Sequence, residues 1–484
     1  MTNPPDHQFS PPPIWRSYLA YATVALMPLS FNIEKLLNQD KKVPVYFSPL
    51  DLFLPLLVLL LIIDLVQRRS WASFQIPPMP SLLWAGVALV SCIFFGGSLK
   101  VWVLNPLLFG VLAVWVFQNI TNSASEFRRL ALILGGSFSV CLLLALKQYV
   151  GPLGIPFDPS KPMQDLGGVT NMRLGGWYDY RGVLGAQAAL LVPAAAAFAL
   201  KDRDSAVRAC AGVIVLIALC VTLAAGGFLG ACAGVIAVAG ACIVRGGKRH
   251  LLAGLAVLLI LWVLLGAILP RLPRQNTAVL LRGVALFADI DADENKKPTA
   301  RLRRYQAVLD SLGRPSNRQK PESRPGWELG VGLGHYQTRI DEFYHPPEYP
   351  KPSRRTDDEA AYDMEADERF TWGFLENVSV ELGLPGLLAV LLLFGTWLSA
   401  ALGAFACLSL PLSTESSVED ENQNEMKAML ALAAYGAGCG ALVLSIFGNP
   451  VIRGVGGSFA FFFALALCAR QWSNRNFGVK SKTD

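Results

Sequence analysis

The residues best suited to chemistry lie in one polar interval, Arg271 to Asn377, between two strongly apolar stretches. The interval carries the arginines Arg301, Arg303 and Arg304 and the histidine His335. A guanidinium group stays charged and its fork matches phosphate oxygens, so the arginines predict binding of an anion such as a diphosphate. A histidine can transfer a proton near neutral pH. Because polar groups are costly inside a bilayer, we expect this interval to handle a hydrophilic or anionic substrate at the membrane surface.

Glu376 is a better candidate for binding a divalent cation than the acidic run Asp357–Glu368. It lies at the end of the polar interval, where the return of the chain to the membrane fixes its position. His335 follows the glycine-rich turn Gly330-Val331-Gly332-Leu333-Gly334, and a structural role beside this turn is the alternative for it. The turn is not part of a strand-turn-helix unit, so we interpret it as a tight turn rather than a nucleotide loop.

Two further arginines, Arg173 and Arg181, precede an apolar stretch and flank the aromatic pair Trp177 and Tyr178. This pattern predicts that the arginines grip a phosphate while the aromatic rings lie against a sugar or a lipid. The alternative is an interfacial aromatic belt with basic anchors.

The segment Thr299–Leu309 has the apolar stripe of an amphipathic helix, with its arginines beside the stripe. Such a helix can lie on the membrane and present cations to a diphosphate. The alternative is a helix whose arginines are solvated or meet lipid headgroups. The acidic run Asp357–Glu368 lacks the spacing of a calcium loop, so we interpret it as solvated and predict no metal site.

Positioning these residues requires a framework of helices in the membrane. Apolar residues make up 53% of the chain and charged residues 16%, and several uncharged runs approach the ~20 residues that cross ~30 Å of hydrocarbon. We therefore predict an all-α polytopic membrane protein with about twelve transmembrane helices and one large helical extracytoplasmic loop. The predicted spans are Ile14–Phe31, Leu50–Val66, Ser81–Phe95, Val101–Val116, Leu130–Val150, Gly182–Leu200, Val207–Ala224, Phe228–Val244, Leu251–Leu269, Leu384–Leu408, Met429–Phe447 and Gly456–Cys468.

Basic residues in short loops predict the orientation of these spans. Arg68-Arg69, Arg128-Arg129, Lys201–Arg208 and Arg245–Arg249 fall on one side, which we predict to be cytoplasmic, although Lys35 and its neighbours disagree. Both termini are then cytoplasmic. These flanking residues account for much of the net charge of +6, which therefore requires no nucleic-acid partner. The predicted organisation is a tail (1–13), nine spans (14–270), a periplasmic loop (271–377), three spans (378–470) and a second tail (471–484).

Four short motifs resemble those of the O-antigen ligase and polymerase family, membrane glycosyltransferases that use polyprenyl-diphosphate-linked glycans. The first is the arginine-glycine-aromatic segment Arg173–Tyr178 with Pro193 in the following span, and the second is Arg301 with Tyr305. The third is the glycine turn ending in His335-Tyr336. The fourth is Val380–Leu387, similar to the signature in which the large loop of the family re-enters the membrane.

Two positions depart from the family pattern. Ala225-Gly226-Gly227 lies where the family has a serine-arginine-glycine turn, and Trp372-Gly373 lies where its ligases have a His-Asn pair. One arginine and one histidine of the family are therefore missing, and other side chains would have to replace them.

The resemblance implies a bacterial inner-membrane glycosyltransferase that transfers or polymerises a lipid-linked glycan without a metal or other cofactor. Its partners would be the polyprenyl-diphosphate-linked glycan and the lipid bilayer. The diphosphate ligands would be Arg173, Arg181, Arg301, Arg303 and Arg304, and the base would be Glu376 or His335. The alternatives are a non-catalytic homologue and a transporter, and a transporter predicts ionisable pairs at mid-span and an internal repeat, neither of which the sequence contains. Nothing in the sequence predicts the oligomeric state.

Overall fold

The computed structural model describes most of the apolar segments and little of the polar interval. The described residues are 14–28, 31–32, 46–47, 49–68, 75–95, 106–120, 123–150, 181–222, 227–245, 308–309, 330–332, 373–410, 417–451 and 455–480, and the architecture below is theirs. The predicted span Leu251–Leu269, most of the predicted periplasmic loop and both predicted tails, apart from the end of the last helix, lie outside them.

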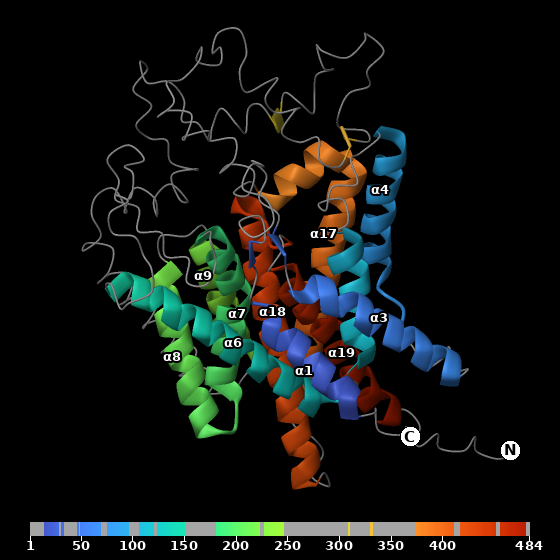
Figure 1. The fold of residues 1–484 in the computed structure, drawn as a ribbon. Helices are drawn as coiled ribbons and strands as arrows, with labels where there is room; N and C mark the ends of the chain where they lie inside the picture. The colour runs from blue at the N-terminus through green and yellow to red at the C-terminus, as the bar shows by residue number, and fades with distance from the viewer. Residues whose placement is uncertain are drawn as a thin grey trace, which may run out of the picture.

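Helices make up almost all of the described structure (Figure 1). One short antiparallel pairing joins β1 (Phe31–Asn32) to β2 (Tyr46–Phe47), and apart from it the described residues confirm the all-α prediction. The helices are α1 (Ile14–Leu26), α3 (Pro49–Arg68), α4 (Met79–Phe95), the π-helical turn η2 (Pro106–Leu112), α5 (Ala113–Ile120), α6 (Ala124–Val150), α7 (Arg181–Lys201), α8 (Ser205–Thr222), α9 (Gly227–Arg245), α17 (Phe374–Leu408), α18 (Val418–Phe447) and α19 (Gly456–Lys480).

Five of the described helices are long and apolar enough to cross a membrane. They are α6, α7, α9, α17 and α18, and the shorter apolar helices include parts of α1, α3, α4 and α8. These lengths and compositions support the assignment of the chain to a membrane, because an apolar helix of about 18 residues or more is typical of a transmembrane span. The total of twelve spans stays a prediction.

Three of these helices, α7, α9 and α18, form a close-packed centre in which small residues face one another. Gly230 and Gly440 meet at Ala189, and one helical turn further along Gly234 and Gly436 meet at Pro193. A Cβ atom on any of the four glycines would overlap backbone or side-chain atoms of a neighbouring helix. Small residues allow helix backbones to approach in this way, which supplies packing energy where lipid offers no hydrophobic driving force.

We expect Gly440→Val to lower the stability of the protein by about 3 kcal/mol, because the new side chain must displace the backbone of α7 at Ala189. Gly395→Val is the matched control, since Gly395 lies on α17 with open space around it. The measurement is the melting temperature of each purified variant in detergent. Equal melting temperatures would contradict the backbone contact between α7 and α18.

Large aromatic residues fill the other side of the centre, between α17 and α19. Trp397 packs against Phe459 and Phe463, with ring centroids 5.1 Å and 5.5 Å away, and its indole nitrogen donates to the Ala434 carbonyl at 2.9 Å. Phe461 extends the cluster toward Phe117 of α5 and Phe127 of α6. The buried indole N–H therefore has a partner, as a polar atom at this depth requires.

Basic side chains lie at the end of the bundle where α6 begins and α7 ends. Arg128 makes two hydrogen bonds of 2.9 Å to the carboxylate of Asp202, whose side chain is 1% exposed. Arg203 and Glu425 form a second ion pair nearby, with both side chains about half exposed. The sequence predicted that this end is cytoplasmic. Its orientation across the membrane stays a prediction.

Candidate functional site at the break in α17

The most unusual backbone among the described residues is a break near the start of α17. Gly383 has φ 64° and ψ −159°, a conformation that side-chain-bearing residues rarely adopt, and Pro385 two residues later cannot donate a backbone hydrogen bond. Figure 1 shows the first segment of α17 lying across the end of the bundle and the rest running alongside α4. The break falls inside Val380–Leu387, the stretch that the sequence predicted to re-enter the membrane.

The glycine-rich turn occupies the gap that this break leaves. The backbone N–H groups of Val331 and Gly332 donate to the carbonyl oxygens of Val380 and Glu381, at 3.0 Å and 2.9 Å. The break removes the helical partners of these two carbonyls, and the Glu381 carbonyl also accepts from the Ser91 hydroxyl at 3.5 Å. Such partners matter because an unsatisfied carbonyl is costly in a membrane. Two of the sequence motifs, far apart in the chain, are therefore in direct contact.

Only glycine fits at the first position of the described turn. Gly330 has φ 72°, and a Cβ atom on it would overlap the backbone of Glu381 and Leu382. The interpretation of this stretch as a tight turn is confirmed for Gly330 and Gly332, both of which have positive φ. His335 and the rest of the turn lie outside the described residues.

The end of α18 and the side of α4 hold the first turn of α17. The Phe374 N–H donates to the Gly448 carbonyl at 2.8 Å. The Phe374 ring packs edge-on against Trp84 of α4, with the ring centroids 5.6 Å apart. Gly373 lies so close to the Ile446 carbonyl that a side chain there would collide with it. Two neighbouring helices, α4 and α18, therefore fix the position of the helical turn that carries Glu376.

Glu376 lies in this first turn and is half-buried. Its carboxyl carbon lies within 3.3 Å of the position that a Cβ on Gly373 would occupy, and its Oε2 atom is shielded from solvent. A carboxylate in the first turn of a helix is also stabilised by the helix dipole. The position therefore suits a proton acceptor held in place, and it equally suits a charge that stabilises the helix start.

Near the start of α7, a buried polar pair links that helix to α19. The Ser458 hydroxyl donates to the Gln187 side-chain oxygen at 2.9 Å, and both residues are fully buried. Polar side chains at this depth are expensive and often mark function. This pair is not among the predicted site residues, although Gln187 is the one strongly polar side chain between Val183 and Leu200 and was a usable signal in the sequence.

Of the five predicted diphosphate ligands, the structure describes only the backbone of Arg181. Arg181 is the first residue of α7, and its helix begins at the same end of the bundle as α17. Its side chain lies outside the described residues, as do Arg173, Arg301, Arg303 and Arg304 in full. Their convergence on one site stays a prediction. Within the described ranges, no three His, Cys, Asp or Glu side chains gather in a way that could hold a metal ion.

No protein-family model matches the chain, and no curated protein matches it at a significant level. The family resemblance therefore depends on the four short motifs, two of which meet at the break in α17.

Proposed function

We propose that the protein is a membrane glycosyltransferase, similar to O-antigen polymerases and ligases, that transfers or polymerises a polyprenyl-diphosphate-linked glycan on the outer face of the inner membrane. The observation that carries the proposal is the pairing of the glycine turn with the break in α17. In the sequence, only the resemblance to the family links these two motifs. Their direct contact in the structure supports the view that they belong to one site.

The proposed reaction needs two kinds of group. An acceptor hydroxyl oxygen attacks the anomeric carbon, the bond from that carbon to the diphosphate breaks, and the hydroxyl proton passes to a base. Cations stabilise the leaving diphosphate, and arginines can do this without a metal because their fork matches phosphate oxygens.

In this proposal Arg173, Arg181 and Arg301, with Arg303 and Arg304 beside them, bind the diphosphate. Glu376 is the preferred base and His335 the second choice. Glu376 is favoured because α4 and the end of α18 fix the segment that carries it.

A transporter is the alternative from another class. Such a protein would carry ionisable side chains within its spans. Charged residues are absent from Val183–Leu200, Gly227–Val244, Leu384–Leu408 and Met429–Ile446, which form most of α7 and α9 and the long parts of α17 and α18. This distribution favours the transferase.

Gene deletion followed by electrophoresis of surface polysaccharide tests the proposal. We expect loss or shortening of long chains, restored by the wild-type gene, because the proposed transfer step would be missing. The purified protein should then transfer a polyprenyl-diphosphate-linked glycan as well in excess chelator as without it. Normal polysaccharide together with defective uptake of a small solute would instead identify a transporter, and a protein inert towards every such donor would identify a non-catalytic homologue.

A further inference from the structure

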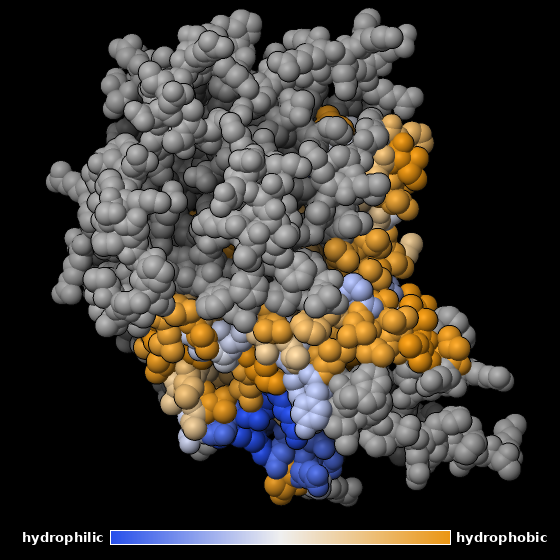
Figure 2. Space-filling view, viewed as in Figure 1, coloured by the Kyte–Doolittle hydropathy of each residue, from blue (hydrophilic) through white to orange (hydrophobic). Residues whose placement is uncertain are grey.

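The buried face of α4 carries one large aromatic side chain, Trp84. Only 2% of it is exposed, although α4 lies at the edge of the bundle in Figure 1. On the opposite face Leu89 and Phe94 are exposed, and Figure 2 shows the apolar surface of this part of the molecule. Trp84 therefore belongs to the interior of the protein rather than to its lipid-facing surface.

Two contacts determine where the Trp84 ring lies. The first is with the π-helical turn η2, where a Cβ atom on Gly110 would lie 2.7 Å from the ring carbons Cε3 and Cζ3. The second is with Phe374, which meets the ring edge-on with the centroids 5.6 Å apart. The indole nitrogen has no hydrogen-bond partner in the part of the chain that the structure describes. Packing against η2 and α17 therefore sets the position of this ring.

The residue beside Gly110 in η2 supports a second helix start. Phe109 lies so close to Gly456, the first residue of α19, that a Cβ atom there would overlap its ring. α19 thus begins directly against η2, and α17 begins against it through Trp84. Single π-helical turns are rare and frequently occur at functional sites.

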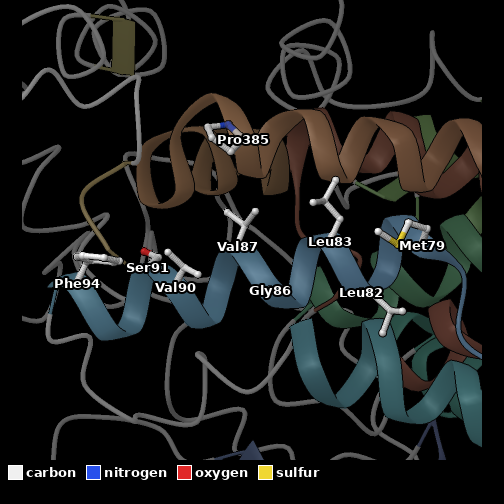
Figure 3. A pocket seen from close by; sticks show the side chains of 9 residues that line it. All are labelled: Met79, Leu82, Leu83, Gly86, Val87, Val90, Ser91, Phe94 and Pro385. Atoms are coloured by element: carbon white, nitrogen blue, oxygen red, sulfur yellow. The ribbon is translucent and has the colours of Figure 1, made fainter.

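α4 contacts α17 on both sides of the break. Before the break, the Ser91 hydroxyl donates to the Glu381 carbonyl. After the break, Figure 3 shows Leu83 pointing toward the part of α17 that carries Pro385. α4 therefore cannot shift as a whole without disturbing both parts of α17. A change at the Trp84 ring is instead passed to the first turn of α17, because close-packed interiors transmit strain.

We propose that η2 positions Glu376 through the Trp84 ring, which makes Gly110 and Trp84 positioning residues for the transfer step. Phe374 and Glu376 lie in the same first turn of α17, so a shift of the Phe374 ring moves the carboxylate. The inference rests on the proposed function, which makes Glu376 the base. It adds η2, an element that none of the four motifs includes.

Gly110→Ala tests the inference by adding one methyl group against the ring. Gly86→Ala is the matched control, because it makes the same change on α4 with no atom within 4 Å of the new Cβ. Melting temperatures of both purified variants in detergent establish that they are folded. Hydrogen exchange of the Phe374–Ser379 amides then reports on the first turn of α17 without any substrate.

We expect Gly110→Ala to lower kcat for glycan transfer by about tenfold, within the ~100-fold that a misplacement of ~1 Å can cost, and to leave KM for the donor unchanged. Exchange of the Phe374–Ser379 amides should become faster. Gly86→Ala should change neither quantity. In a Glu376→Gln background, Gly110→Ala should cause no further loss, because the group that it displaces is already absent.

A second variant approaches the same contact from α4. Trp84→Leu removes the ring that the new methyl group strikes, so we expect a similar fall in kcat and no further fall when Gly110→Ala is added. Trp397→Leu is the control, because it removes another fully buried tryptophan, one whose indole nitrogen donates to the Ala434 carbonyl. It should lower the melting temperature and leave kcat unchanged.

Several results would overturn the inference. They are an unchanged kcat in Gly110→Ala, an equal loss in Gly86→Ala, a full further loss in the Glu376→Gln background, and equal falls in kcat for Trp84→Leu and Trp397→Leu. Each would mean that the Trp84 contact does not act on the base.

Amide exchange separates this inference from the proposed function. Faster exchange of the first turn of α17 in Gly110→Ala, in a protein inert in transfer, would refute the function and leave the route from η2 to that turn standing. Active transfer with unchanged kcat and unchanged exchange in Gly110→Ala would refute the route and leave the function standing.

Discussion

Asp202→Ala is expected to lower the free energy of unfolding by about 3 kcal/mol, the low end of the range for breaking a buried ion pair. The Asp202 side chain is 1% exposed, and its carboxylate accepts two bonds from Arg128 and a third from the Asp204 backbone N–H. Removing the carboxylate leaves the guanidinium without this partner and loosens the turn between α7 and α8. Arg128 is 28% exposed and can partly reach water, which is why the low end applies.

Glu425→Ala is the matched control for this prediction. Glu425 pairs with Arg203 at the same 2.9 Å, but the two side chains are 56% and 48% exposed. Exposed pairs contribute ~0–1 kcal/mol. Chemical denaturation of both variants in detergent should therefore separate them, and adding Arg128→Ala to Asp202→Ala should recover part of the loss. Equal stabilities of the two single variants would mean that Asp202 is solvated.

Glu376→Gln is expected to lower the rate of glycan transfer by about a hundredfold or more, the usual contribution of a general base. Glutamine keeps the size of the side chain and removes the group that accepts the proton. The acidic limb of the pH–rate profile should disappear with the carboxylate, while KM for the donor changes little. The measurement is the initial rate of transfer by purified protein across a series of pH values.

A helix-stabilising role for Glu376 makes a different prediction. Loss of a charge in the first turn costs ~0.3–1 kcal/mol of stability. A lower melting temperature with a normal rate and an unaltered pH profile would assign Glu376 to that role and leave His335 as the remaining base.

The sequence located several helices well because their apolar runs end at polar or charged residues. The predicted spans Gly182–Leu200 and Phe228–Val244 match α7 and α9 to within a residue at each end. The prediction was less accurate where a helix continues through polar sequence. α18 begins at Val418 rather than Met429, because Ser417 caps a polar first turn through a hydrogen bond from the Asp420 N–H.

The candidate site was harder to predict than the helices. α17 begins at Phe374, earlier than the predicted Leu384, because the segment before Gly383 is helical but carries Glu376 and Glu381 and so lacks an apolar run. Spacing along the chain also could not place Gly332 against Glu381, because that contact is made in three dimensions by segments far apart in sequence. The apolar pocket that α4 lines together with Pro385 of α17 depends on the distance between two helices, which no local pattern encodes.

The glycine-lined contact of α18 with α7 and α9 affects the order in which the protein can assemble. α18 is synthesised after the whole of the polar interval, and so after both of its partners. Until then Gly230 and Gly234 of α9 lack the α18 backbone that packs against them. Contacts between such distant segments slow folding, and an exposed unfinished surface invites misassembly. A nascent chain stalled before Val418 should therefore be a target for membrane quality control, whereas one stalled after Phe447 should already hold its central core.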